Sequence, residues 1–260
     1  MRICRFIDVR SSTPRFGILQ SDSILPLAQG ETIESFPSPP TDQAIAVSSV
    51  RILAPVIPSK IICVGRNYRD HAAELGNPMP IEPLLFLKAP SAIIGDGDPI
   101  ILPGDSSDVQ HEGELGVVVG RQAHNVGDDE DVLSYVLGYT CVNDVTARDL
   151  QKRDVQFTRA KSFDTFCPVG PVIVSGIDPG DLEVTTRVND EVRQRGRTSA
   201  MAFSVPFLVR YISRIMTLLP GDLISTGTPA GVSRLQEGDV VQVEVSGIGR
   251  LSNMVRVNAK

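Results

Sequence analysis

The chain has 260 residues, of which 42% are hydrophobic, so it is long enough to bury a sizeable core in one large domain or two small ones. Its formal net charge of -6 argues against a dedicated nucleic-acid-binding protein, which usually carries a basic patch. No apolar run reaches the roughly 18 residues that a membrane helix requires, so we expect no membrane partner.

The first residues, MRICRFIDVRSSTPRFG, lack the apolar segment and the small-residue cleavage site of a signal peptide. The chain has four cysteines, none of which forms a CxxC pair: Cys4, Cys63, Cys141 and Cys167. Reduced thiols in a cytoplasmic protein are the simplest interpretation. Because the chain has only three histidines, a zinc cluster is disfavoured, and any metal is expected to be held by oxygen.

Short strands are predicted in the first 50 or so residues, in ICRFIDV, RFGILQ and SILPLA. The segment ESFPSPPTDQ contains three prolines, which is typical of a connection. It is followed by VRILAPVIPSKIICVG, which predicts a strand, a proline turn and a second strand. These features predict a small N-terminal β module at residues 1–58 and a larger domain at residues 59–260.

Helices are expected to be few, at residues 67–76, 129–138, 145–155 and 204–221. The last of these has Ser204 as a candidate N-cap. It carries an apolar stripe that we interpret as core packing, formed by Val205, Leu208, Ile212, Ile215 and Leu219. The remaining sequence predicts strands separated by Gly-Asp turns, so the fold class is a β-rich α+β fold.

Several familiar ligand-binding motifs are absent from the sequence. There is no GxGxxG dinucleotide loop, no GxxxxGK[ST] phosphate loop and no GxSxG nucleophile elbow. The stretch GDGDPI has alternating aspartates but lacks the glutamate at the twelfth position of an EF-hand loop.

Two glutamates precede a valine-rich run in HEGELGVVVG. Glu112 and Glu114 are two apart on the expected strand, so they point to the same face and need a cation or basic side chains as partners. Asp144, in YTCVNDVTARDLQ, follows an apolar strand at a strand-to-helix corner. Three carboxylates suit Mg²⁺ or Mn²⁺, although pairing of the glutamates with arginines on an exposed face explains the same spacing.

Four sequence blocks, in the same order, resemble the fumarylacetoacetate hydrolase family: HEGELGVVVG, GYTCVNDVTARDLQ, AKSFDTFCPVGP and PGDLISTGTPAGV. The resemblance covers roughly residues 51 to 257, and the N-terminal stretch resembles the small β module of many bacterial members. It implies a mixed β-sandwich roll, a homodimer, and a metal triad of Glu112, Glu114 and Asp144 that binds Mg²⁺ or Mn²⁺.

The resemblance also assigns roles around the metal. His71 and Glu74 are three apart on a helix and match the family's water-activating dyad on a helical lid. Lys161, in RAKSFDTF, matches an active-site lysine that would stabilise an enolate or oxyanion. A surface His–Glu contact and a solvated lysine are the alternative interpretations. The expected substrate-binding residues are Gln151, Arg66, Tyr68, Lys88 and Thr228.

Three other residues near these motifs are expected to have structural roles. His111 should point to the strand face opposite Glu112, where it supports the packing. Gly227 and Gly231 are expected to form a turn rather than to contact the chemistry.

The favoured reaction is hydrolysis of a C–C bond in a β-diketo acid, such as an acylpyruvate or fumarylpyruvate. His71 and Glu74 would deliver water, and Lys161 with the cation would hold the enolate. Isomerisation of a 2-hydroxydienoate from aromatic catabolism, or decarboxylation of oxaloacetate, is the alternative because both reactions pass through an enolate. A non-catalytic metal-binding or dimeric interaction protein is a third reading, which the triad, dyad and lysine argue against.

Overall fold

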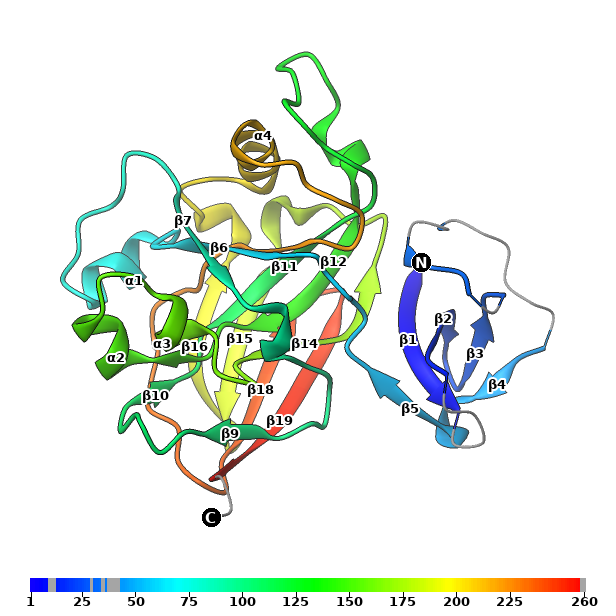
Figure 1. The fold of residues 1–260 in the computed structure, drawn as a ribbon, viewed down its shortest axis with the longest axis horizontal. Helices are drawn as coiled ribbons and strands as arrows, with labels where there is room; N and C mark the ends of the chain where they lie inside the picture. Colours follow the sequence, from blue (N-terminus) through cyan, green and yellow to red (C-terminus); the bar gives the residue numbers. More distant parts are fainter. Residues whose placement is uncertain (9–12, 29, 34–35, 37–42, 258–260) are drawn as a thin grey trace.

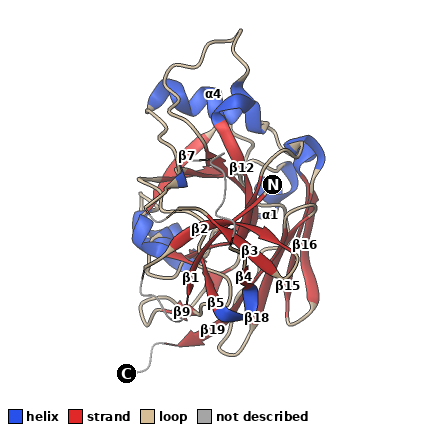
Figure 2. Cartoon of the chain, turned by 90° about the vertical axis from the view of Figure 1, so that its right-hand side faces the viewer, coloured by secondary structure: helices blue, strands red, loops and turns tan. Residues whose placement is uncertain are grey.

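The computed structural model describes residues 1–8, 13–28, 30–33, 36 and 43–257. Strands dominate and the helices are short, which confirms the predicted β-rich fold class (Figure 1, Figure 2). The proline-rich segment predicted as a connection lies almost entirely outside the described residues.

A large mixed sheet contains twelve strands, and its main path runs β4-β3-β2-β1-β14-β12-β11-β17-β6-β7. β5 pairs with β1, and β8 pairs with β14. β17 and β6 run parallel, as do β14 and β8. The strands are β1 (Arg2–Asp8), β2 (Arg15–Gln20), β3 (Ser23–Pro26), β4 (Ile45–Ala46), β5 (Val50–Leu53), β6 (Ile61–Gly65), β7 (Leu84–Lys88), β8 (Ile93–Ile94), β11 (Gly113–Val119), β12 (Val136–Asn143), β14 (Cys167–Val174) and β17 (Leu223–Ser225).

A second sheet has the order β16-β15-β18-β19-β9 and packs against β11, β12 and β14 of the large sheet. The core between them contains valines from both sheets, such as Val117, Val184 and Val243. β11 is buried along its whole length, which explains its unbroken apolar run. The strands of the second sheet are β9 (Ile100–Leu102), β15 (Glu183–Val188), β16 (Glu191–Arg197), β18 (Val240–Val245) and β19 (Gly249–Val257), and a separate pair is formed by β10 (Val109–Gln110) and β13 (Thr146–Ala147).

Three short helices, α1 (Arg69–Glu74), α2 (Arg148–Arg153) and α3 (Thr158–Lys161), gather on one side of the sheets (Figure 1). α2 and α3 contact each other, and α3 also contacts β7. The longer α4 (Val205–Ile215) lies away from them, at the top of the view in Figure 1. Among the described residues, none of the helices has the length and apolar character needed to span a membrane.

The helix predicted at residues 129–138 is wrong. A 3-10 helix covers only Val132–Tyr135, and β12 starts at Val136. Asp131 caps the 3-10 turn by accepting a hydrogen bond from the Leu133 amide. Pairing of residues 136–143 with β11 and β14 overrides the local helical pattern. Gly138 allows β12 and β14 to approach each other closely, because a Cβ at this position would lie 2.5 Å from the carbonyl oxygen of Val174.

The predicted helix at residues 204–221 is shorter than expected. α4 ends at Ile215 because Met216 is extended and Leu218 pairs with Ala123. Val205, Leu208 and Ile212 are buried as predicted, whereas Ile215 is 55% exposed. The apolar stripe therefore packs into the core only along its first two turns.

The N-terminal strands extend the large sheet, because β1 pairs with β14 through Arg2–Val174 and Ile3–Ile173. In Figure 1 these strands form the lobe on the right-hand side. The division at residues 58 and 59 therefore stays a prediction. All four cysteines are buried and free, in agreement with reduced thiols.

Candidate metal centre and active site

Two neighbouring strands bring three carboxylates to one point. Glu112 directly precedes β11, Glu114 is the second residue of β11, and Asp144 follows the end of the adjacent β12. The Asp144 amide donates a 2.8 Å hydrogen bond to the carbonyl of Glu112, which fixes the two residues side by side. One oxygen from each carboxylate lies within 4.8 Å of the others, and all three residues are buried.

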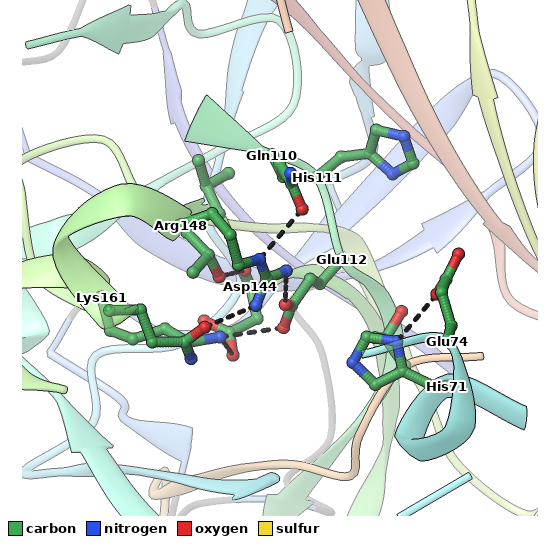
Figure 3. A network of polar contacts seen from close by, with 12 residues as sticks. His71, Glu74, Gln110, His111, Glu112, Asp144, Arg148 and Lys161 are labelled. Atoms are coloured by element: carbon green, nitrogen blue, oxygen red, sulfur yellow. Dashed lines mark hydrogen bonds and ion pairs between the residues drawn. The ribbon is translucent and has the colours of Figure 1, made fainter. Parts of the chain in front are cut away.

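Three buried cations contact two of these carboxylates, and Figure 3 shows two of the cations, Arg148 and Lys161. Lys161 Nζ bridges Glu112 Oε2 at 2.8 Å and Asp144 Oδ2 at 2.6 Å. Lys88 Nζ lies 2.6 Å from Asp144 Oδ1, and Arg148 forms an ion pair with Glu112 Oε1. The site thus balances three carboxylates with three cations inside the protein.

These charges set the protonation of the central groups. Burial raises the pKa of Glu112, but the charges of Lys161 and Arg148 outweigh burial and lower it. Burial lowers the pKa of Lys161, but Asp144 and Glu112 outweigh burial and raise it. Lys161 is therefore a charged ammonium group at the base of the site.

Glu114 has no such cationic partner within the described residues. Its Oε2 accepts hydrogen bonds from the Ser225 hydroxyl at 2.5 Å and the Gly227 amide at 2.7 Å. Among the described residues, none donates a hydrogen bond to Oε1. Burial and the charges of Asp144 and Glu112 raise the pKa of Glu114, so a bound cation would favour the charged form of this carboxylate.

The donor set fits a hard divalent cation. The three candidate ligands are all carboxylates, whose oxygens Mg²⁺ and Mn²⁺ prefer over nitrogen or sulfur. The predicted convergence of Glu112, Glu114 and Asp144 is thus seen in the structure.

A cavity of about 300 Å³ opens above the carboxylates. It is lined by the predicted residues His71, Lys161, Arg66, Gln151 and Thr228, together with the three carboxylates. Apolar walls come from Val64, Leu75, Leu84, Phe86 and Phe157. A small polar molecule with an apolar stretch suits this lining.

Two residues predicted to bind substrate do not line the cavity. Lys88 is buried behind Asp144 and also donates a 3.1 Å hydrogen bond to the carbonyl of Val145. Tyr68 is 3% exposed, and its hydroxyl has no hydrogen-bond partner among the described residues. Both side chains face the protein interior, where Lys88 contacts Asp144, and a role for either residue in substrate binding stays a prediction.

α1 carries the predicted dyad to the cavity. His71 Nδ1 lies 3.3 Å from Glu74 Oε2, and the ring is buried against the cavity. Glu74 is anchored from the opposite side, because the Gly231 amide donates to its Oε1 at 3.0 Å. In the view of Figure 3, the dyad lies on one side of Glu112, and Lys161 with Arg148 lies on the other.

The two glycines predicted to serve only a turn also contact the site. Gly227 has φ +99°, and a Cβ there would lie 2.7 Å from the Asn67 side chain. Gly231 has φ +104°, and a Cβ would lie 1.9 Å from the carbonyl oxygen of Arg193. Their amides bind Glu114 and Glu74, so glycine is needed for both conformation and close approach.

Arg148 is a site residue that the sequence reasoning missed. It lines the cavity, pairs with Glu112 and donates to Gln151 Oε1 at 2.6 Å. The sequence contained a signal for this role, namely the helical spacing of Arg148 and Gln151. Arg148 precedes Gln151 by three residues on α2 and therefore lies on the same helix face.

His111 points away from the cavity, as predicted. It is fully buried, with Nδ1 3.0 Å from Gln194 Oε1 and Nε2 2.9 Å from the Ser233 hydroxyl. Burial lowers the pKa of His111 to about 4.

His111 predicts a loss of stability in mild acid. In the unfolded chain this histidine has a pKa near 6.5, whereas in the folded protein its pKa is about 4. The stability that the neutral, buried ring contributes is therefore complete above pH 6.5 and is lost as the pH falls toward 4. Between pH 7 and pH 5 the loss is about 2 kcal/mol. Urea unfolding of the wild type and of His111→Gln should show this difference in pH dependence. Parallel curves for the two proteins would contradict it.

The carboxylate triad predicts stabilisation by metal. At a Mn²⁺ concentration 100-fold above the dissociation constant, the free energy of unfolding should rise by about 2.7 kcal/mol, because the cation binds only the folded chain. Calorimetry with Mn²⁺ or a chelator measures this effect. Asp144→Asn should abolish the shift in melting temperature, and an equal shift in both proteins would rule out this site.

Comparisons with known proteins agree with this geometry. The family described as fumarylacetoacetate (FAA) hydrolase C-terminal matches residues 60–256, and an N-terminal family described as Rv2993c-like matches residues 1–55. The oxaloacetate tautomerase YisK from Bacillus subtilis is 46% identical over 225 residues, which cover 81% of this chain and 74% of that protein.

Two solved structures share the fold over the full length of both chains. The 2-hydroxyhepta-2,4-diene-1,7-dioate isomerase from Mycobacterium marinum has a TM-score of 0.90 and 43% identity, covering 100% of each chain. The maleylpyruvate hydrolase from Sphingobium sp. SYK-6, in complex with manganese(II) and pyruvate, has a TM-score of 0.82 and 30% identity, also covering 100% of each chain. The predicted mixed β-sandwich roll is thereby confirmed, and the chain is an enzyme that belongs to the fumarylacetoacetate hydrolase family.

Proposed function

We propose that this enzyme interconverts the keto and enol forms of a small dianionic 2-oxo acid, with oxaloacetate as the representative substrate. The charge balance of the site carries this proposal. Lys88, Lys161 and Arg148 pair with Glu112 and Asp144, so a divalent cation bound next to Glu114 would leave the site with a net positive charge that favours an anionic substrate.

Two further cations in the cavity favour a second carboxylate on the substrate. Arg66 and Lys152 line the cavity, and neither forms an ion pair within the described part of the chain. Arg66 has φ +57°, a conformation that is uncommon outside glycine and is often found at functional sites. Its planar guanidinium suits bidentate binding of a carboxylate.

The chain's own residues provide the proton transfer. Isomerisation moves one proton between C3 and the oxygen on C2, and it consumes no water. A dication held by the triad would polarise the oxo group as a Lewis acid. The ring nitrogen of His71 that does not face Glu74 accepts the C3 proton and returns it to the oxygen on C2 as the enol forms. Glu74 stabilises the charged imidazole between these transfers, and the Lys161 ammonium stabilises the enolate oxygen.

The relatives support an isomerase more than the hydrolase that the sequence favoured. The relative from Bacillus subtilis is named an oxaloacetate tautomerase, and the structure from Mycobacterium marinum is named an isomerase. Both activities require enolisation without addition of water, which the site described above provides.

Hydrolysis of an acylpyruvate is the second candidate, and the His71–Glu74 pair is the observation that favours it. A base held by a carboxylate can activate water, whose oxygen attacks the distal carbonyl while the C–C bond breaks to release pyruvate enolate and a carboxylic acid. The similarity to a maleylpyruvate hydrolase supports this second reaction.

A substrate panel separates the two reactions. With oxaloacetate enol, we expect a fast loss of the ultraviolet enol absorbance without release of pyruvate or CO₂. With acylpyruvates, the hydrolase reaction would release pyruvate. Fast pyruvate release from an acylpyruvate, with no acceleration of ketonisation above the metal-only control, would replace the isomerase proposal with the hydrolase.

We also propose that the enzyme is a cytoplasmic homodimer that uses Mg²⁺ or Mn²⁺ and serves aromatic catabolism or a neighbouring pathway of oxo acids. The fumarylacetoacetate hydrolase fold and the carboxylate donor set support the metal. Sedimentation velocity of the full chain tests the dimer, and a single species of about 28 kDa would contradict it.

A further inference from the structure

Gln194 is a buried amide on an otherwise exposed strand. It lies on β16, where most of the other side chains face solvent, yet it is only 1% exposed. Its side chain reaches beneath the start of β11, next to the metal triad. Because burial of an unpaired amide is costly, the contacts of this side chain are informative.

All four hydrogen-bonding positions of the amide are used. Nε2 donates to the carbonyl of Pro229 at 2.7 Å and to the Thr228 hydroxyl at 2.7 Å. Because a carbonyl oxygen can only accept a hydrogen bond, the group that faces Pro229 must be the NH₂ group. Oε1 therefore faces the Gly113 amide at 3.0 Å and the His111 ring at 3.0 Å, so His111 Nδ1 carries a proton. The amide has one orientation.

The two ends of this amide hold the two halves of the site. Oε1 binds the backbone of Gly113, which lies between Glu112 and Glu114. Nε2 binds the segment at residues 228–229, and two residues later Gly231 holds Glu74 of the dyad. Thr228 completes the link, because its hydroxyl donates to the carbonyl of Gly113 at 2.8 Å.

We propose that Gln194 is a positioning residue that fixes the metal triad relative to the His71–Glu74 dyad. It touches neither substrate nor metal, because it lies outside the residues that line the cavity. The role proposed for Gln194 depends on the proposed function in one respect, namely that both use the same triad and the same dyad. Metal affinity and amide exchange do not depend on which reaction is catalysed, so the two proposals can fail separately.

Gln194→Met tests this role, because methionine has a similar length but forms none of the four hydrogen bonds. We expect Mn²⁺ affinity to fall by about 10-fold or more, as found for residues that orient metal ligands. Electron paramagnetic resonance measures bound Mn²⁺ at a temperature where the variant is folded. Gln242→Met on β18 is the matched control, since its Oε1 has no hydrogen-bond partner in the part of the chain that the structure describes.

Amide exchange in the metal-free protein provides a readout independent of activity. In Gln194→Met, the amides of Gly113 and Gly231 should both exchange faster than in Gln242→Met. Gln194→Glu is the second variant. It retains the acceptor for Gly113 but places an oxygen against the Pro229 carbonyl, so exchange should increase mainly at Gly231.

Coupling between the two halves is tested by combining Gln194→Met with His71→Ala. If Gln194 acts partly through the dyad, the two losses in kcat should be less than additive. Unchanged Mn²⁺ affinity in folded Gln194→Met, with Gly113 and Gly231 exchanging as in Gln242→Met, would overturn the proposal. A lower melting temperature with unchanged affinity would also overturn it, because the role would be structural only.

Discussion

His71→Ala and Glu74→Gln should each lower kcat by roughly 10²- to 10⁴-fold, the range for loss of a positioned general base. His71 lines the cavity, and its Nδ1 is held by Glu74 at 3.3 Å, so the other ring nitrogen is free to move a proton. Glu74→Gln keeps the shape but removes the charge that stabilises the protonated ring. Steady-state kinetics on oxaloacetate enol and on acylpyruvates measures the loss.

The control for the dyad variants is metal binding. Neither residue belongs to the carboxylate triad, so Mn²⁺ affinity should stay close to that of the wild type. Metal-promoted decarboxylation of oxaloacetate needs no base to remove a carbon-bound proton, so the background CO₂ release should be the same for the variants and the wild type. Variants that retain full isomerase and hydrolase rates would show that the dyad is a structural contact.

Lys161→Met should lower kcat by about 10²-fold or more, as for the loss of one oxyanion-stabilising donor. Lys161 is a buried ammonium that faces the cavity and lies 2.6 Å from Asp144. Its charge offsets the negative charge that develops on the enolate oxygen. A variant with near wild-type kcat at saturating metal would make Lys161 a bystander.

Lys161→Met should lower kcat without weakening metal binding. Without Lys161, Glu112 and Asp144 lose a shared cation, so the metal-free protein should be less stable and should bind Mn²⁺ at least as tightly. Lys88→Met is the comparator, because Lys88 also pairs with Asp144 but does not line the cavity. We expect Lys88→Met to affect stability similarly and kcat much less.

The convergence of the metal triad could be predicted because it depends on local geometry. Side chains two apart on a strand share a face, and a strand-to-helix corner exposes its side chain to a cleft. Both rules applied to Glu112, Glu114 and Asp144, which meet in the structure. The helical spacing of His71 and Glu74 is equally local, and their contact was predicted for the same reason.

The remaining features depend on contacts between distant parts of the chain. Lys88 is 56 residues from Asp144, and no local pattern indicates that it lies behind the site rather than in the cavity. Gln194 is 81 residues from Gly113, and the edge strand that carries it is otherwise exposed. The failed helix at residues 129–138 has the same origin, because pairing of β12 with two neighbours overrides local preference.

If this site enolises a 2-oxo acid, the C3 protons of the substrate must exchange with solvent. Proton NMR of oxaloacetate in D₂O with Mg²⁺ follows the loss of the C3 signal. We expect the wild type to accelerate exchange well above the Mg²⁺-only rate, and Asp144→Asn and Lys161→Met to lose most of that acceleration. Exchange by the wild type no faster than with Mg²⁺ alone would contradict the account.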